Sequence, residues 1–201
     1  MGKHDLSQRA VFLDRDGVLN VPVIRDGRPY PPSSLTQFRL YDDALEACSR
    51  LKAAGLLLVV ATNQPDVGRG TQTVAAVEEF HRKLRRVLPV IDRIETCYHA
   101  GKRFGDSCDC RKPRPGMLLR AAAAMNIDLP RSYFIGDRWR DVECARAVQA
   151  RAVFIDRGYT ERLRRSADFF ARSFSQAVDA VLRDLETSAL PTRSLTTQPL
   201  S

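Results

Sequence analysis

The chain has no long apolar segment. None of its 201 residues belongs to a run of the roughly 18 apolar residues that span a bilayer, and its first residues, MGKHDLSQRA, contain no apolar signal core. Aromatic residues are few, at 7% of the chain, and they form no stripe with basic residues of the kind that stacks on bases. We therefore expect a cytoplasmic protein with neither a membrane nor a nucleic acid as partner.

The chain also lacks an even set of cysteines and a block of one charge. Its five cysteines cannot all pair within the chain, and three of them lie between residues 97 and 110, so metal binding fits better than a disulfide framework. The net charge is +8, yet lysine and arginine are spread along the sequence. Small anionic substrates explain that balance as well as nucleic acid does.

The remaining composition is that of an ordinary globular protein. Hydrophobic residues make up 44% of the chain and charged residues 28%, which excludes wholesale disorder, collagen and coiled-coil classes. The length suits one domain, which we place at residues 1–186 and expect to be monomeric. Residues 187–201 are rich in Ser, Thr, Pro and Leu without periodicity, so we expect a disordered tail there.

Short apolar runs alternate with amphipathic stretches along the chain. The expected strands are 10–13, 56–61, 93–97, 132–135 and 152–155. The expected helices are a segment opened by Asp42 or Asp43 that ends near Ala54, a segment opened by Thr71 or Thr73 that ends at Val87, and 115–126, 139–149 and 174–185. This alternation is typical of an α/β fold with a doubly wound, Rossmann-like parallel sheet.

Two segments, 21–38 and 98–114, interrupt the alternation. Long loops of this kind in a compact domain are usually functional or disordered. Neither has room for a separate lid domain of typical size. We therefore expect no large cap domain, and a substrate that is recognised by loops.

Polar motifs follow the ends of the expected strands or lie within the second of these loops. In chain order they are Asp14 and Asp16, Thr62 and Asn63, Arg111 and Lys112, and Asp137 and Asp141. Each alone fits a polar turn or a solvated basic pair. Together they form a joint signal, because open α/β sheets build their sites at the carboxyl ends of their strands. Clustered carboxylates at that edge also repel one another unless a cation is bound.

The segments DRDGVL, TN, RKP and GDRWRD resemble, in order and over roughly residues 10–160, the motifs of the haloacid dehalogenase superfamily of phosphohydrolases. Within it the chain is most similar to the group of heptose bisphosphate and histidinol-phosphate phosphatases. The resemblance implies Asp14 as nucleophile and Asp16 as general acid and base. It implies phosphate binding by Thr62, Asn63 and Lys112. It also implies a Mg²⁺ site formed by Asp14, the backbone carbonyl of Asp16 and Asp137, supported by Asp141.

General chemistry supports these roles. A bound Mg²⁺ and Lys112 would offset the repulsion between an attacking carboxylate and a phosphate ester, and an acid two residues from the nucleophile would protonate the leaving alkoxide. The resemblance implies a phosphorylated sugar as substrate, with the 7-phosphate of D-glycero-D-manno-heptose 1,7-bisphosphate removed, and the chemistry above implies an aspartyl-phosphate intermediate. Arg111, with Arg69 and Arg114 behind it, is the candidate to hold a second phosphate.

Three alternatives to this function stay open. Histidinol phosphate or another small sugar phosphate is a rival substrate, although Gly68-Arg69-Gly70 looks more like the heptose enzymes. The +8 charge permits a polynucleotide phosphatase. A catalytically silent, zinc-stapled interaction module is a third reading, which the retained carboxylates argue against.

The cysteine cluster predicts a second metal site. Cys97, His99, Cys108 and Cys110 supply three thiolates and one imidazole, the ligand set of a closed structural Zn²⁺ site. The alternative is a group of buried free thiols beside a surface histidine. The resemblance favours zinc, since C-x-H with C-x-C directly before RKP is typical of this subgroup, although Tyr98 stands where its members often have proline.

Three other candidates have plainer interpretations. His81 lies among Arg82, Lys83 and further arginines on an amphipathic helix, which predicts a solvated position. Cys48 and Cys144 fall within expected helices, where a buried thiol is more often part of the core than a ligand.

Overall fold

The computed structural model describes residues 7–189. Its main sheet has six parallel strands in the order β5-β4-β1-β6-β7-β8. The strands are β1 (Ala10–Leu13), β4 (Leu57–Asn63), β5 (Arg93–Cys97), β6 (Tyr133–Gly136), β7 (Arg151–Ile155) and β8 (Phe169–Ala171). Five of them match the expected strands to within two residues at each end, and β8 was not expected.

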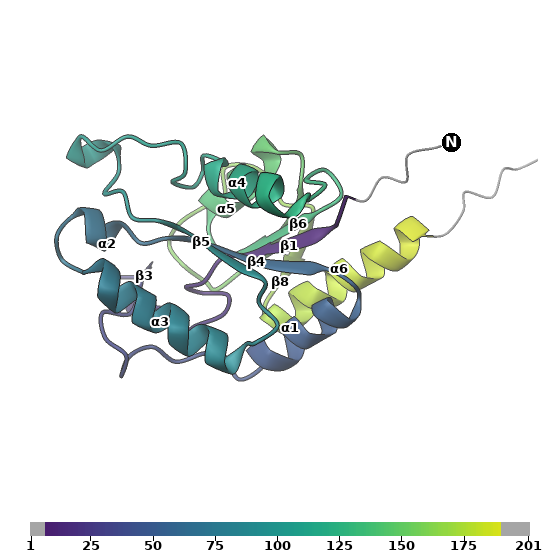
Figure 1. Cartoon of the computed structure of the whole chain (residues 1–201), viewed down its shortest axis with the longest axis horizontal. Coiled ribbons are helices and arrows are strands. Elements are labelled where there is room, and N and C mark those ends of the chain that lie inside the picture. The colour runs from purple at the N-terminus through teal and green to yellow at the C-terminus, as the bar shows by residue number, and fades with distance from the viewer. Residues whose placement is uncertain (1–6, 190–201) are drawn as a thin grey trace, which may run out of the picture.

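Helices cover both faces of this sheet (Figure 1). On one face lie α1 (Ala44–Ala53), α3 (Val74–Val87) and α6 (Phe174–Ala189), and on the other α4 (Gly116–Met125) and α5 (Trp139–Ala147). The side chains of β1 alternate between two cores, since Val11 and Leu13 pack toward the first face and Ala10 and Phe12 toward the second. A strand covered on both faces is apolar throughout, which is why the doubly wound arrangement was predictable.

Local signals explain where the helices begin and end. The Thr73 hydroxyl accepts a hydrogen bond from the backbone N–H of Ala76 at 3.1 Å, a cap that contributes about 1 kcal/mol. Helix α6 continues to Ala189, beyond the end expected at residue 185 and beyond the expected domain boundary at residue 186, and that boundary stays a prediction. The helix persists beyond its last core contacts because its own hydrogen bonds continue, and Thr187 Oγ1 donates to the carbonyl of Arg183 at 2.9 Å. The rest of the expected tail, 190–201, lies outside the described residues.

The first interrupting segment contains a β-hairpin that the sequence analysis missed. Strands β2 (Val23–Arg25) and β3 (Arg28–Tyr30) pair antiparallel, joined by Asp26 and Gly27, both at positive φ. An Asp-Gly pair is a strong signal for this tight turn, but each strand has only three residues. Thr160 donates its backbone N–H to the carbonyl of Gly27 at 3.1 Å, which ties the hairpin to the segment after β7.

The second interrupting segment, which follows β5, has little regular structure. It contains one turn of 3-10 helix, Lys102–Phe104. A short helix, α2 (Pro65–Gly68), packs against its beginning, where Gly68 N donates to the carbonyl of Tyr98 at 2.9 Å. Within residues 7–189, no helix has both the length and the apolar character needed to cross a membrane.

Candidate active site

The strand order brings the predicted motifs together. The chain passes from β1 to β4 on one side and returns to β6 on the other side of β1, so the carboxyl end of β1 is a topological switch point, where α/β sheets bind ligands. Asp14 and Asp16 follow β1, and Asp137 follows β6. Thr62 and Asn63 end β4. The polar residues that the sequence analysis placed at separate strand ends therefore share one edge of the sheet.

Three buried carboxylates form a cluster at this edge. Ligand oxygens of Asp14, Asp137 and Asp141 lie within 4.8 Å of one another. Gly17, at φ +94°, allows this approach, because a Cβ there would lie 1.7 Å from Asp137 Oδ2. Burial raises the pKa of Asp14 to about 6 although Lys112 opposes the shift, and burial together with Asp14 raises the pKa of Asp137 well above its ordinary value.

The cluster suits a hard divalent cation. Both carboxylate oxygens of Asp137 are buried, and the Tyr159 hydroxyl beside them lowers the carboxyl pKa less than burial and the neighbouring carboxylates raise it. Oxygen donors with this excess of negative charge are the ligands that Mg²⁺ prefers. The Asp16 side chain does not belong to the cluster, so its expected contribution to a metal site, through the backbone carbonyl, stays a prediction.

Lys112 is the buried cation of the site. Its Nζ lies 2.9 Å from Asp14 Oδ1 and 2.7 Å from Asp141 Oδ1. Burial lowers the pKa of this ammonium, but the two carboxylates outweigh burial and hold the pKa above its ordinary value. Asn63 fixes the Lys112 backbone, since its Nδ2 donates to the Lys112 carbonyl at 3.2 Å and its Oδ1 accepts from the Lys112 N–H at 3.1 Å. The Asn63 carboxamide therefore positions Lys112, and phosphate binding by Asn63 stays a prediction.

Asp16 is surrounded by donors that the sequence analysis did not single out. Asn20 Nδ2 donates to its Oδ1 at 3.0 Å, and Gln64 Nε2 donates to its Oδ2 at 2.8 Å. Arg15 Nη2 lies 3.1 Å from both oxygens. Gln64 also donates to Thr62 Oγ1 at 2.8 Å, which leaves the Thr62 hydroxyl hydrogen free to donate elsewhere. Asn20 and Gln64 directly follow two of the recognised motifs, and this position in the sequence was the only signal that could have identified them.

A cavity of about 470 Å³ is lined by Asp14, Asp16, Asn63 and Lys112 and is strongly basic, whereas Thr62 does not line it. Besides Lys112, its lining contains six arginines, namely Arg28, Arg69, Arg103, Arg111, Arg138 and Arg140. Arg138 and Arg140 pair with Glu161, and Arg69 pairs with Asp66. Arg111 has no carboxylate partner among the described residues and donates to the His99 carbonyl at 3.3 Å. Arg114, expected behind Arg111, does not line this cavity and instead donates to the Cys108 carbonyl.

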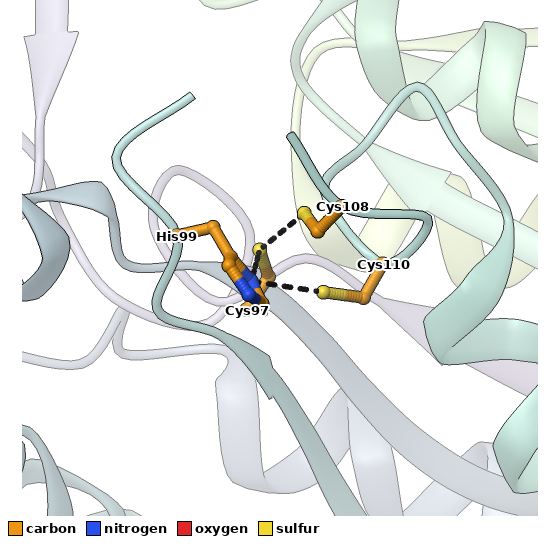
Figure 2. A group of neighbouring side chains, drawn as sticks. All are labelled: Cys97, His99, Cys108 and Cys110. Carbon is orange, nitrogen blue, oxygen red and sulfur yellow. Dashed lines mark hydrogen bonds between the residues drawn. The ribbon is translucent and has the colours of Figure 1, made fainter. Parts of the chain in front are cut away.

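The four predicted zinc ligands converge beside the cavity, and their side chains point toward one another in Figure 2. Cys97 Sγ lies 3.7 Å from Cys108 Sγ and 3.6 Å from His99 Nδ1, and Cys110 Sγ lies 3.3 Å from His99 Nδ1. Tetrahedral Zn²⁺ with bonds of about 2.3 Å to sulfur places neighbouring sulfurs about 3.8 Å apart. The geometry and the donor set therefore fit Zn²⁺.

Comparison with known proteins identifies the family. A model described as haloacid dehalogenase-like hydrolase matches residues 23–146, and a second HAD-hydrolase-like model matches residues 109–187. The chain belongs to the haloacid dehalogenase-like hydrolases, which confirms the resemblance of its motifs and the class of its fold.

Curated relatives are identical to this chain at about a third of the aligned positions. It is 36% identical over 157 residues to the D-glycero-beta-D-manno-heptose-1,7-bisphosphate 7-phosphatase of Pseudomonas aeruginosa, an alignment covering 76% of this chain and 84% of the relative. It is 37% identical over 147 residues to the Escherichia coli K12 protein of the same name, covering 69% of this chain and 74% of the relative.

Solved structures show the same architecture. The D,D-heptose 1,7-bisphosphate phosphatase of B. bronchiseptica, crystallised with magnesium and phosphate, superposes with a TM-score of 0.73 at 27% identity, covering 88% of this chain and 99% of that chain. A protein from Mesorhizobium loti described as a HAD-like phosphatase has a TM-score of 0.72 at 27% identity, with coverages of 93% and 90%.

Proposed function

We propose that this hydrolase removes the 7-phosphate of D-glycero-D-manno-heptose 1,7-bisphosphate. The main support is the meeting of Asp14, Asp16 and Lys112 at the base of one basic cavity, in a chain similar to enzymes that bear that substrate in their names. The cytoplasmic location and the monomeric state expected from the sequence stay predictions.

In the proposed reaction a carboxylate oxygen of Asp14 attacks phosphorus, and the bond from phosphorus to the sugar oxygen breaks. Asp16 gives its proton to that departing oxygen. A water molecule then attacks the aspartyl-phosphate and loses a proton to Asp16, and the phosphorus–Asp14 bond breaks to release inorganic phosphate. Lys112 and the Thr62 hydroxyl hold the phosphoryl oxygens while charge moves across them.

Two metal ions fit these side chains. Asp14, Asp137 and the backbone carbonyl of Asp16 would hold Mg²⁺, with Asp141 in support, and bound Mg²⁺ supplies positive charge beside the phosphoryl group. A similar enzyme was crystallised with magnesium and phosphate. Zn²⁺ at the cysteine cluster would act structurally, because all four positions of a tetrahedral site are taken by protein ligands.

Unpaired guanidinium groups in the cavity favour a bisphosphate as substrate. Arg28, Arg103 and Arg111 line the cavity without a carboxylate partner among the described residues. A guanidinium can hold a phosphate through two parallel hydrogen bonds, and Arg111 is not engaged by a carboxylate of the described residues. A second phosphate on the same sugar would occupy this position. Histidinol phosphate has only one phosphate, so it would not use this contact.

Phosphate release measured over a panel of esters tests the proposal. The panel contains both anomers of heptose 1,7-bisphosphate, histidinol phosphate, other sugar phosphates and 3′-phosphorylated oligonucleotides. We expect the highest kcat/KM for one heptose bisphosphate anomer, and no turnover by the near-isosteric Asp14→Asn variant, whose amide cannot form the acyl phosphate.

Other outcomes would change the assignment in defined ways. A higher kcat/KM for histidinol phosphate than for both anomers would replace the substrate and leave the mechanism in place. Wild-type activity in metal-loaded Asp14→Asn protein would remove the nucleophile assignment. Inactivity toward every ester would favour the zinc-stapled interaction module.

A further inference from the structure

Arg15 is a fully buried arginine between the two catalytic carboxylates in sequence. Its guanidinium lies 5.5 Å from the centre of the Phe38 ring and 5.6 Å from that of Phe80, two rings that stack 5.2 Å apart. Asp16 is its one carboxylate partner among the described residues. A buried guanidinium lowers stability unless it is well paired. The burial of Arg15 beside Asp16 therefore requires an explanation.

Three more side chains continue from Arg15 toward the surface. Arg15 Nη1 lies 3.4 Å from His81 Nε2, and His81 Nδ1 lies 3.1 Å from Glu78 Oε1. The same Glu78 oxygen accepts a hydrogen bond from the Tyr98 hydroxyl at 2.6 Å. Arginine can only donate, so His81 Nε2 must accept and His81 Nδ1–H must donate to Glu78. The four side chains thus form one row in which Arg15 donates to His81, and both His81 and Tyr98 donate to Glu78.

The protonation state of the histidine agrees with this row. Burial, reinforced by the positive charge of Arg15, lowers the pKa of His81 to about 4. The imidazole is therefore neutral near neutral pH and keeps a lone pair for Arg15. A protonated imidazole would place a second positive charge against the guanidinium.

We propose that Arg15 is a positioning residue that holds the plane of the Asp16 carboxylate for proton transfer, and that His81, Glu78 and Tyr98 hold Arg15 in turn. This inference rests on the proposed role of Asp16 as general acid and base. The row spans three separate parts of the fold, because Arg15 follows β1, His81 and Glu78 lie on α3, and Tyr98 lies in the loop of the cysteine cluster.

The geometry at Asp16 supports positioning over simple charge balance. Arg15 Nη2 contacts both carboxylate oxygens, and Nε reaches Oδ1 at 3.4 Å. A planar guanidinium constrains the plane of its partner, whereas the compact ammonium of lysine does not. Asn20 and Gln64 each hold one oxygen, so Arg15 is the group that contacts both.

The test uses a readout that depends on the acid. An alkoxide is a strong base that needs a proton as it leaves, whereas p-nitrophenolate leaves without one. The parameter kcat/KM reports the steps up to release of this group, so hydrolysis of the aspartyl-phosphate does not enter it. We compare p-nitrophenyl phosphate with the best alkyl phosphate of the substrate panel. For Arg15→Lys we expect kcat/KM to fall by about tenfold or more for the alkyl ester and by less than about threefold for the aryl ester.

A second pair of variants leaves both catalytic carboxylates and Arg15 in place. His81→Leu removes the acceptor of Arg15 and should produce the same ester-selective loss. His81→Gln retains a carbonyl oxygen that can accept from Arg15, so it should restore much of the alkyl activity. Tyr133→Phe is the control for general effects, since the Tyr133 hydroxyl donates to Asp184 at 2.6 Å on another part of the sheet, and it should alter neither ester.

Asp16→Asn separates this inference from the function on which it rests. If Asp16→Asn lowers kcat/KM equally for both esters, the general-acid role itself fails. If Asp16→Asn is selective for the alkyl ester but folded Arg15→Lys and His81→Leu are not, the positioning role is overturned and the function stands. Should Arg15→Lys not fold, the two His81 variants decide, and equal activities of His81→Leu and His81→Gln on the alkyl ester contradict the proposal.

Discussion

Among single residues, Arg111 combines a position in the cavity with a guanidinium free of carboxylate partners in the described chain. We expect Arg111→Ala to lower kcat/KM for heptose 1,7-bisphosphate by about 10- to 100-fold, the loss of one charge-assisted contact, and to lower turnover of p-nitrophenyl phosphate far less. Lys102→Ala is the control, because this exposed lysine of the same loop does not line the cavity. Equal losses on both esters would place Arg111 at the reacting phosphate or in the fold.

His81 makes stability depend on pH. Burial lowers its pKa from 6.5 to about 4 in the folded protein, so the folded state binds fewer protons than the unfolded state between these values. The contribution of the neutral, buried His81 to the free energy of unfolding is fully present above pH 6.5 and is lost as pH falls through about 4. A shift of this size corresponds to about 3 kcal/mol.

The difference between wild type and His81→Gln isolates this effect from the carboxylates that titrate in the same range. Urea unfolding at a series of pH values should show that the wild-type free energy of unfolding falls more steeply between pH 6.5 and 4 than that of the variant. Parallel curves would contradict the low pKa of His81.

Among the elements, the loop between β5 and α4 combines the cysteine cluster with Lys112. A metal that joins Cys97 and His99 to Cys108 and Cys110 fixes both ends of the loop and thereby the approach of Lys112 to Asp14. The position of this loop, and not only its own stability, therefore depends on the proposed Zn²⁺.

Elemental analysis tests the zinc assignment. We expect about one zinc per chain in the wild type. In Cys110→Ala we expect a lower zinc content, a lower melting temperature and a lower activity together, because the free energy of metal binding also stabilises the fold. Cys48→Ala removes an equally buried thiol outside the cluster, so it should keep its zinc. Protein prepared without zinc that is folded, active and unresponsive to added Zn²⁺ would refute a structural role.

For the whole molecule, the buried acidic cluster predicts that the metal-free fold is less stable than the metal-bound one. Asp14, Asp137 and Asp141 share one buried site, and their mutual repulsion lowers stability until a cation binds. Saturating Mg²⁺ at 100 times its Kd would add about 2.7 kcal/mol.

Thermal unfolding with and without Mg²⁺ measures this stabilisation. Asp137→Asn removes one charge, so it should raise the melting temperature of metal-free protein and abolish the increase on adding Mg²⁺. Asp184→Asn also removes one negative charge, but on α6 and away from the site, so this variant should keep the Mg²⁺ response. An undiminished response in Asp137→Asn would exclude Asp137 as a ligand.

The sequence by itself determined five of the six strands of the main sheet and the polar residues at its carboxyl edge. Buried parallel strands are short apolar runs, and the polar residues that follow them must meet where the carboxyl ends meet. Asp14, Thr62 and Asp137 were predictable for this reason. The hairpin at 23–30 was missed because strands of three residues leave almost no periodic signal.

Only the tertiary structure decided what the polar side chains contact. His81 was expected in solvent among basic neighbours, yet it is buried, because Phe80 and Leu84 place its face of α3 against the core. Its partner Arg15 is 66 residues away in sequence. The Asn63 carboxamide likewise forms hydrogen bonds with the backbone of Lys112, 49 residues away. Burying a polar group is tolerated only where a partner is present, and no local pattern of residues records a partner that distant segments bring.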